Sequence, residues 1–178
     1  PTDLLFDAKS KEGILYGRTD THWNQKGSYL AFKLLMENLS LKTPSIEFIK
    51  NTKTRSGDLI EISGLSEFPL SVGDDWMFKG LNESDLEIFP NVLHKNSSNS
   101  FGTGWEGVVK NAKGLNDKTI WVVGDSFTNA VKPYLNASFT ETRYLGHWSD
   151  KLNDLPLLLS EAVVKPDLVI VVRVERSF

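Results

Sequence analysis

Two short stretches of the sequence contain residue types that can do nucleophilic chemistry. The first, GRTDTHWNQKGSYLAF at positions 17–32, sets Asp20 two residues before His22 and then runs into an amphipathic segment. The second, VVGDSF at positions 122–127, places Ser126 just after an apolar run. A serine nucleophile needs a base within hydrogen-bond reach, and that base needs an acceptor to orient its other ring nitrogen. The two stretches together supply all three groups.

The spacing of Asp20 and His22 favours contact between them. If residues 20–22 are extended or turn-like, both side chains point to the same side, so the carboxylate can hold one imidazole nitrogen while the other faces outward. A local turn contact or one half of a metal site would explain the same pair. The other histidines, His94 and His147, show no ligand spacing, which disfavours a metal site.

Ser126 follows an apolar run, residues 119–123, that predicts a buried strand leading into a helix. Gly124 leaves the backbone room to turn. The turn would set the hydroxyl above the edge of the sheet, with the Ser126 N–H at the helix start facing a developing oxyanion. A serine that only caps the helix is the alternative.

The elements around these residues follow from periodicity. Strands are predicted at residues 13–16, 45–49, 119–123, 138–145 and 167–174. Helices are predicted from a cap at Asn24 to about residue 40, up to about residue 135 after the Ser126 turn, and over 150–164. Asp58 is expected to cap a short helix, with a catalytic role as the alternative. The loop-rich insertion at about 64–114 is of a length that more often binds something than stabilises a fold.

The order strand, helix, strand, helix, strand predicts one α/β domain over residues 1–178. Right-handed crossovers would give it a mostly parallel sheet with helices on both faces. The formal charge of −3, without a basic cluster, argues against nucleic-acid binding. The absence of cysteine excludes disulfides, thiolate metal sites and cysteine nucleophiles. Because the chain begins with Pro1 and not Met, we expect it to be a piece of a longer protein.

The two motifs together resemble a known family. TDTHWNQKG with Trp23 directly after the histidine, the GDL turn at 57–59, VVGDSF and the terminal PDLVIVVRVER are similar to the alginate O-acetyltransferase group of SGNH-hydrolase-like proteins. The resemblance spans about residues 13–176. It implies a flavodoxin-like, three-layer α/β/α fold and transfer of acetyl groups to sugar hydroxyls of extracytoplasmic polysaccharides.

By matching motifs, the resemblance implies a triad of Asp20, His22 and Ser126, in an order permuted from ordinary SGNH esterases. It further implies a polysaccharide acceptor, an acetyl donor, a membrane partner for acyl transfer, a periplasmic or cell-surface location, and neither cofactor nor metal. The separate Gly and Asn blocks of ordinary SGNH enzymes are missing. The candidates for the second oxyanion donor are therefore Asn129, Arg143 and Arg176. For each of them a surface or packing role is the alternative.

Aromatic rings near these motifs offer a platform for a sugar ring. The candidates are Trp23, Tyr144, His147 and Trp148, with core or rim packing as the alternative for Trp23 and Tyr144. Three other functions remain open: an acetyl esterase with the same triad, a glycan-binding module without turnover, and a phosphate- or nucleotide-binding domain. The last is disfavoured because no Gly-rich phosphate loop follows the first predicted strand.

Overall fold

The structure, a computed structural model, describes residues 2–51, 57–64, 75–81, 85–89 and 106–174. The chain forms two compact units, Pro1–Leu81 and Asn82–Phe178. Each unit contains one sheet in the described part of the chain. Among the described residues, no helix combines the length and the apolar character needed to cross a bilayer.

The first unit is built around α2, Gln25–Asn38, which begins where the sequence predicted. Asn24 caps it, because the Asn24 side chain accepts a hydrogen bond from the Gly27 N–H at 3.0 Å. The helix buries Phe32 and Met36, and the Tyr29 ring packs edge-on against Phe48, with the centroids 5.5 Å apart. The remaining elements are α1 (Thr2–Glu12), β1 (Glu47–Asn51), α3 (Asp58–Ser63) and β2 (Asp75–Lys79).

Two predictions for the first unit need correction. Residues 13–16 do not form a strand, because only Tyr16 makes a bridge, antiparallel with Trp23. The preceding segment forms α1, which the sequence pattern did not predict; its apolar residues lack a clear one-sided stripe. The predicted strand at 45–49 is present as β1, and it pairs antiparallel with β2.

The second unit contains a five-stranded sheet in the order β3-β4-β6-β5-β7. Its strands are β3 (Leu86–Phe89), β4 (Glu106–Asn111), β5 (Asn116–Gly124), β6 (Phe139–His147) and β7 (Leu168–Val172). β5 pairs parallel with β6 and β7, whereas β3–β4 and β4–β6 are antiparallel. The sheet is therefore mixed, and the predicted mostly parallel sheet is limited to its β6-β5-β7 half.

The antiparallel half comes from the stretch predicted as a loop-rich insertion. β3 and β4 of this sheet lie within residues 64–114, as does β2 of the first unit. These strands are four to six residues long, and their apolar residues do not form the long buried run that identified β5. The middle of the predicted insertion, residues 90–105, lies outside the described residues.

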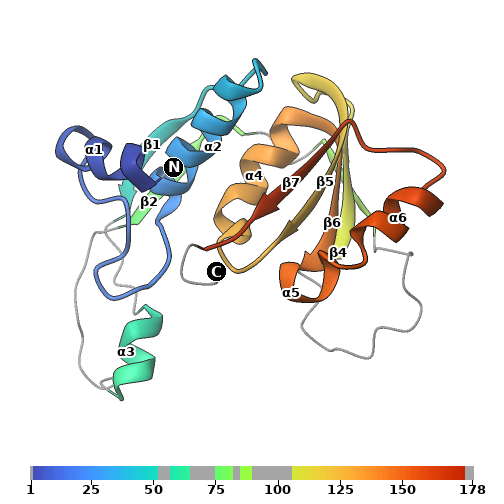
Figure 1. Ribbon diagram of the computed structural model, residues 1–178. Coiled ribbons are helices and arrows are strands. Elements are labelled where there is room, and N and C mark those ends of the chain that lie inside the picture. The colour runs from blue at the N-terminus through green and yellow to red at the C-terminus, as the bar shows by residue number, and fades with distance from the viewer. Residues whose placement is uncertain (1, 52–56, 65–74, 82–84, 90–105, 175–178) are drawn as a thin grey trace. The chain divides into compact units, whose positions relative to one another are not determined.

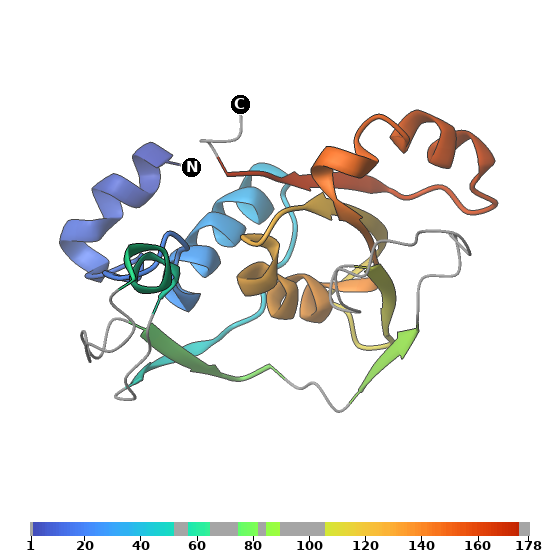
Figure 2. The ribbon, with the colours of Figure 1, turned by 90° about the horizontal axis from the view of Figure 1, so that it is seen from below.

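Helices cover both faces of the five-stranded sheet (Figures 1 and 2). α4, Thr128–Ser138, lies on one face and buries Val131, Tyr134 and Leu135. α5 (Trp148–Lys151) and α6 (Leu155–Glu161) lie on the other face. On this face the sheet residues Trp121, Val123 and Leu145 form a buried cluster. The aliphatic residues that pack against it are Leu152, Leu155, Leu158, Leu159 and Ala162.

The predicted helix at 150–164 is divided into α5 and α6. Pro156 is the second residue of α6. Proline fits the first turn of a helix because it has no N–H to donate, but it disrupts a continuous helix. The first helix therefore ends at Lys151, and a new helix begins after Asp154.

Candidate active site

A tight loop between α1 and α2 presents His22. The loop is closed by the Tyr16–Trp23 bridge and by a hydrogen bond from the Gly17 N–H to the His22 carbonyl at 3.3 Å. Beyond it, Asn24 donates to the Ile14 carbonyl at 2.7 Å. The loop is thus held at its base by backbone bonds and at its exit by the helix cap.

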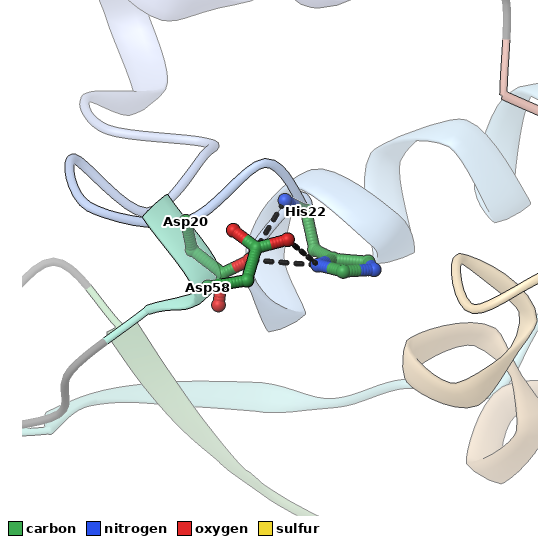
Figure 3. A group of neighbouring side chains, drawn as sticks. All are labelled: Asp20, His22 and Asp58. Carbon is green, nitrogen blue, oxygen red and sulfur yellow. Dashed lines mark hydrogen bonds and ion pairs between the residues drawn. The ribbon is translucent and has the colours of Figure 1, made fainter. Parts of the chain in front are cut away.

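Within this loop the predicted contact between Asp20 and His22 is present. Asp20 Oδ1 lies 2.7 Å from His22 Nδ1 and also accepts the His22 backbone N–H at 2.9 Å. The Asp20 side chain is 13% exposed and that of His22 is 27% exposed. Figure 3 shows the second ring nitrogen, Nε2, directed away from the carboxylates. The carboxylate therefore orients the imidazole in the way that a general base requires.

Asp58, at the start of α3, lies against the same loop from a distant part of the sequence (Figure 3). Its Oδ1 accepts the Thr21 N–H at 2.7 Å, its Oδ2 accepts the Thr21 hydroxyl, and Oδ2 lies 3.5 Å from His22 Nδ1. Burial alone would raise the pKa of Asp58, but the hydrogen bonds from Thr21 and the neighbouring His22 hold it below its ordinary value.

The prediction that Asp58 caps α3 is wrong. The N-cap is Gly57, which makes no side-chain cap bond, and the Asp58 carboxylate bonds outside its own helix, to Thr21. Sequence reasoning therefore missed the contact of Asp58 with this loop. The GDL motif marked the residue, but nothing in the spacing tied it to a partner 37 positions away.

Gly57 allows α3 to approach the loop. A Cβ at this position would lie 2.1 Å from the Thr19 carbonyl oxygen and 2.5 Å from Asp20 Cβ, which no side chain tolerates. The Leu59 N–H donates to that same Thr19 carbonyl at 3.1 Å. The start of α3 and the loop thus meet backbone to backbone.

These groups line a pocket within the first unit. A sugar-platform candidate, Trp23, is half-buried at its wall beside His22. The surface of the pocket is formed by carboxylates, an imidazole, an indole and backbone atoms. The lining residues are Gly17, Thr19, Asp20, His22, Trp23, Asn24, Gly57 and Asp75.

The same cluster has the composition of a metal site. Asp20, His22 and Asp58 each offer one ligand atom, and these atoms lie within 4.8 Å of one another. A cation bound there would need a free lone pair on His22 Nδ1. In the Asp20–His22 hydrogen bond this nitrogen carries a proton, so the cation would displace that bond. The short contact between Asp20 and His22 thus fits an imidazole that is oriented by a hydrogen bond and binds no metal through Nδ1.

In the second unit, Ser126 lies where β5 turns into α4. Asp125, 5% exposed, shapes the turn: its carboxylate accepts the Phe127 N–H at 3.0 Å and the Val174 N–H at 2.7 Å. The N-cap of α4 is Phe127, so Ser126 does not hold the capping position. A Cβ on Gly124 would lie 1.9 Å from Thr128 Oγ1, which explains the glycine at the turn.

Two of the other candidate residues in the second unit make packing contacts within it. Tyr144 is 5% exposed, and its hydroxyl donates to Asn136 Oδ1 at 2.7 Å; burial raises its pKa. The Arg143 guanidinium lies over the Trp121 ring, 5.7 Å from Cζ to the centroid. The buried Tyr144 cannot be a sugar platform, and the stacking of Arg143 on the sheet favours its packing role.

The remaining candidates lie elsewhere in the second unit. Asn129 is exposed in the first turn of α4. His147 ends β6 opposite Gly124, and its Nδ1 lies 2.8 Å from Ser149 Oγ. Trp148 begins α5, but its side chain lies outside the described part of the structure, as does the whole of Arg176.

No family model matches the sequence, and no curated protein matches it. Solved structures do match. A DHHW family protein from Eubacterium siraeum has a TM-score of 0.59 at 18% identity, over 96% of this chain and 62% of that one. PatB1 from Bacillus cereus has a TM-score of 0.57 at 19% identity, over 94% of this chain and 65% of that one.

The O-acetyltransferase domain of Pseudomonas putida AlgJ has a TM-score of 0.53 at 17% identity, over 99% of this chain and 61% of that one. At this level of identity the likeness shows a shared fold. The chain spans a little over three fifths of the length of these solved chains.

Proposed function

We propose that this chain is the catalytic part of a serine-dependent O-acetyltransferase that acts on an extracytoplasmic polysaccharide. The observation that carries the proposal is the 2.7 Å contact between Asp20 Oδ1 and His22 Nδ1, which leaves Nε2 pointing outward (Figure 3). The fold shared with the AlgJ O-acetyltransferase domain supports the same reaction class. The SGNH-like permuted triad belongs to this proposal.

Three residues carry the first half of the reaction. Ser126 Oγ attacks the carbonyl carbon of an acetyl donor while its proton passes to His22 Nε2. The bond between the acetyl group and the donor's leaving group breaks, and the leaving group takes that proton from His22. Asp20 keeps the imidazole oriented and stabilises the imidazolium that forms. The acetyl group remains on Ser126 as an ester.

The second half transfers the acetyl group to the acceptor. A sugar hydroxyl attacks the Ser126 ester and gives its proton to His22, and Ser126 leaves and recovers that proton. Exclusion of water from the acetyl-enzyme is what separates transfer from hydrolysis. The polysaccharide acceptor, the acetyl donor, a membrane partner that supplies it, and a periplasmic or cell-surface location all belong to the proposal.

The test is to incubate the purified chain with p-nitrophenyl acetate and measure both turnover and intact mass. The wild type should accumulate a single acetyl adduct, and Ser126→Ala should not. Ser126→Ala, His22→Ala and Asp20→Asn should each lower turnover by roughly a thousandfold or more while the fold is retained. Adding an oligosaccharide acceptor should divert the acetyl group from water to sugar hydroxyls.

Ser160→Ala is the matched control, because Ser160 is an exposed serine on α6 whose hydroxyl donates to the nearby Leu157 carbonyl. It should keep wild-type turnover. A sulfonyl fluoride gives a second probe, suggested by the solved sulfonyl adduct of Bacillus cereus PatB1. Full activity in a folded Ser126→Ala variant would overturn the nucleophile assignment.

A further inference from the structure

We infer that Asp58 is a positioning residue for His22, a role that rests on the proposed function of the Asp20–His22 pair. Each carboxylate oxygen of Asp58 makes a contact with the loop. Oδ1 accepts the Thr21 N–H at 2.7 Å, and Oδ2 accepts the Thr21 hydroxyl while lying 3.5 Å from His22 Nδ1.

The first effect of Asp58 is mechanical. Thr21 is the residue between Asp20 and His22, so fixing both its N–H and its hydroxyl fixes the peptide that joins the acid to the base. The Leu59 N–H bond to Thr19 at 3.1 Å and the contact at Gly57 keep the start of α3 in place. Asp58 therefore reaches the loop from a backbone that is itself attached to the loop.

The second effect is electrostatic. In the proposed reaction His22 becomes an imidazolium whose Nδ1–H faces Asp20 Oδ1 at 2.7 Å and Asp58 Oδ2 at 3.5 Å. The two side chains of this His22–Asp58 contact are 27% and 32% exposed, so solvent screens the pair only in part. A second negative charge at this position stabilises the charged intermediate state more than the neutral ground state.

A purely structural role at the start of a helix does not account for this geometry. An acidic residue in the first turn is favoured by the helix dipole, but α3 has only six residues. Its second acid, Glu61, is exposed and also lies in that first turn. Of the two acids, Asp58 is the one that accepts hydrogen bonds from Thr21 of the loop. Glu61 thus provides a control that changes the charge of α3 without changing the loop.

The test separates the two effects with two substitutions in the full chain. In Asp58→Asn the amide oxygen still accepts the Thr21 N–H, and the amide nitrogen can donate to the Thr21 hydroxyl, which reverses that bond. The negative charge near His22 is lost while both contacts with Thr21 can be kept. We expect kcat for p-nitrophenyl acetate to fall about tenfold with KM unchanged. Hydrogen exchange at the Thr21 amide should stay at the wild-type rate.

Asp58→Ala removes the bonds as well as the charge. Exchange at the Thr21 amide should be faster by about tenfold or more, and kcat should fall further than in Asp58→Asn. Thr21→Val, which removes only the hydroxyl donor, should give a smaller fall and serves if Asp58→Ala does not fold. Glu61→Gln should match the wild type in every measurement.

Wild-type kcat in Asp58→Asn, or wild-type Thr21 exchange in Asp58→Ala, would overturn the inference. The exchange measurement does not depend on turnover. If the wild type fails to cleave any acetyl ester, the proposed function is lost, while Thr21 exchange in Asp58→Ala still decides whether Asp58 holds the loop.

Discussion

At the residue scale, the ionisation of Asp58 couples the stability of the loop to pH. The two Thr21 hydrogen bonds and the neighbouring His22 favour the carboxylate over the acid and outweigh burial, so the pKa of Asp58 lies below its ordinary value. A group whose pKa is lowered by folding stabilises the folded state above its unfolded pKa. This stabilisation is lost as the pH falls through the folded pKa.

We therefore predict that Asp58→Asn lowers the free energy of unfolding at neutral pH and that this difference shrinks as the pH falls below about 4. Urea unfolding at pH 7, 5, 4 and 3, followed by circular dichroism, measures it. Glu61→Gln should give a difference that is small at every pH. A gap between wild type and Asp58→Asn that stays constant down to pH 3 would show that the carboxylate is not favoured by folding.

The sequence predicted those site contacts that are local in the chain. Asp20 and His22 are two positions apart, so a turn suffices to bring them together. The contact of Asp58 depends on the tertiary approach of α3, which a single sequence does not show. Tyr144 was nominated as a sugar platform by its place in the chain, but α4 covers it: its hydroxyl contacts Asn136 of that helix, and the residue is 5% exposed.

At the scale of elements, the contact between α3 and the loop depends on one missing methyl group. Gly57 has a φ of −96°, which any residue adopts, so its requirement is steric and not conformational. The nearest atoms to an added Cβ are the Thr19 carbonyl and Asp20 Cβ. Both belong to the loop that carries the proposed acid and base.

We predict that Gly57→Ala moves α3 away from the loop. The cost should be about 1–3 kcal/mol of unfolding free energy, as for other overpacked sites, and the Thr21 amide should lose protection together with turnover. Thermal unfolding and hydrogen exchange measure the two effects. Ile62→Ala, on the same helix at a side chain 77% exposed, is the control and should change neither.

If Gly57→Ala retains wild-type turnover and Thr21 protection, the loop does not depend on the close approach of α3. If it unfolds the chain as a whole, the milder Asp58→Ala variant still measures the contact. A loss of turnover with unchanged Thr21 exchange would contradict the mechanical link between α3 and the loop.

Elements with strong local signals were predicted well. Asn24 caps α2 as expected, and β5 and β7 contain the long apolar runs that identified them. β3 and β4 were not predicted, because four- and six-residue strands with charged positions carry little periodic signal. Pairing decides their structure, because β4 pairs with β6 and β3 pairs with β4, and the β4–β6 pairing is a long-range effect.

At the scale of the whole molecule, the mixed sheet places Ser126 at the carboxyl edge of its parallel half. β6, β5 and β7 are parallel, so their carboxyl ends lie together, and the turns after them converge there. Asp125 ties two of these ends by accepting the Val174 N–H at 2.7 Å. The antiparallel β3 and β4 extend the opposite side of the sheet, beyond β6, and leave this edge unchanged.

The proposed reaction requires His22 of the first unit to reach Ser126 of the second. Because the sequence has no cysteine, a His22→Cys, Ser126→Cys variant carries one defined pair of thiols. We predict that a short thiol cross-linker joins this pair within one chain, since a working triad places these side chains within hydrogen-bond reach of each other. Intact mass and peptide mapping identify the product.

The control pair is His22→Cys with Asp117→Cys. Asp117 is an exposed residue near the start of β5, roughly 25 Å from the Ser126 end of the strand at the usual rise per residue. Both variants must label fully with a monofunctional maleimide, so that reactivity is equal and only distance differs. Efficient cross-linking of the first pair and not of the second supports the triad. Equal cross-linking yields for the two pairs, or no cross-link in the first pair, would show that Ser126 and His22 do not come within reach of each other. The acetyl-enzyme mechanism would then be wrong, whatever the turnover measurements give.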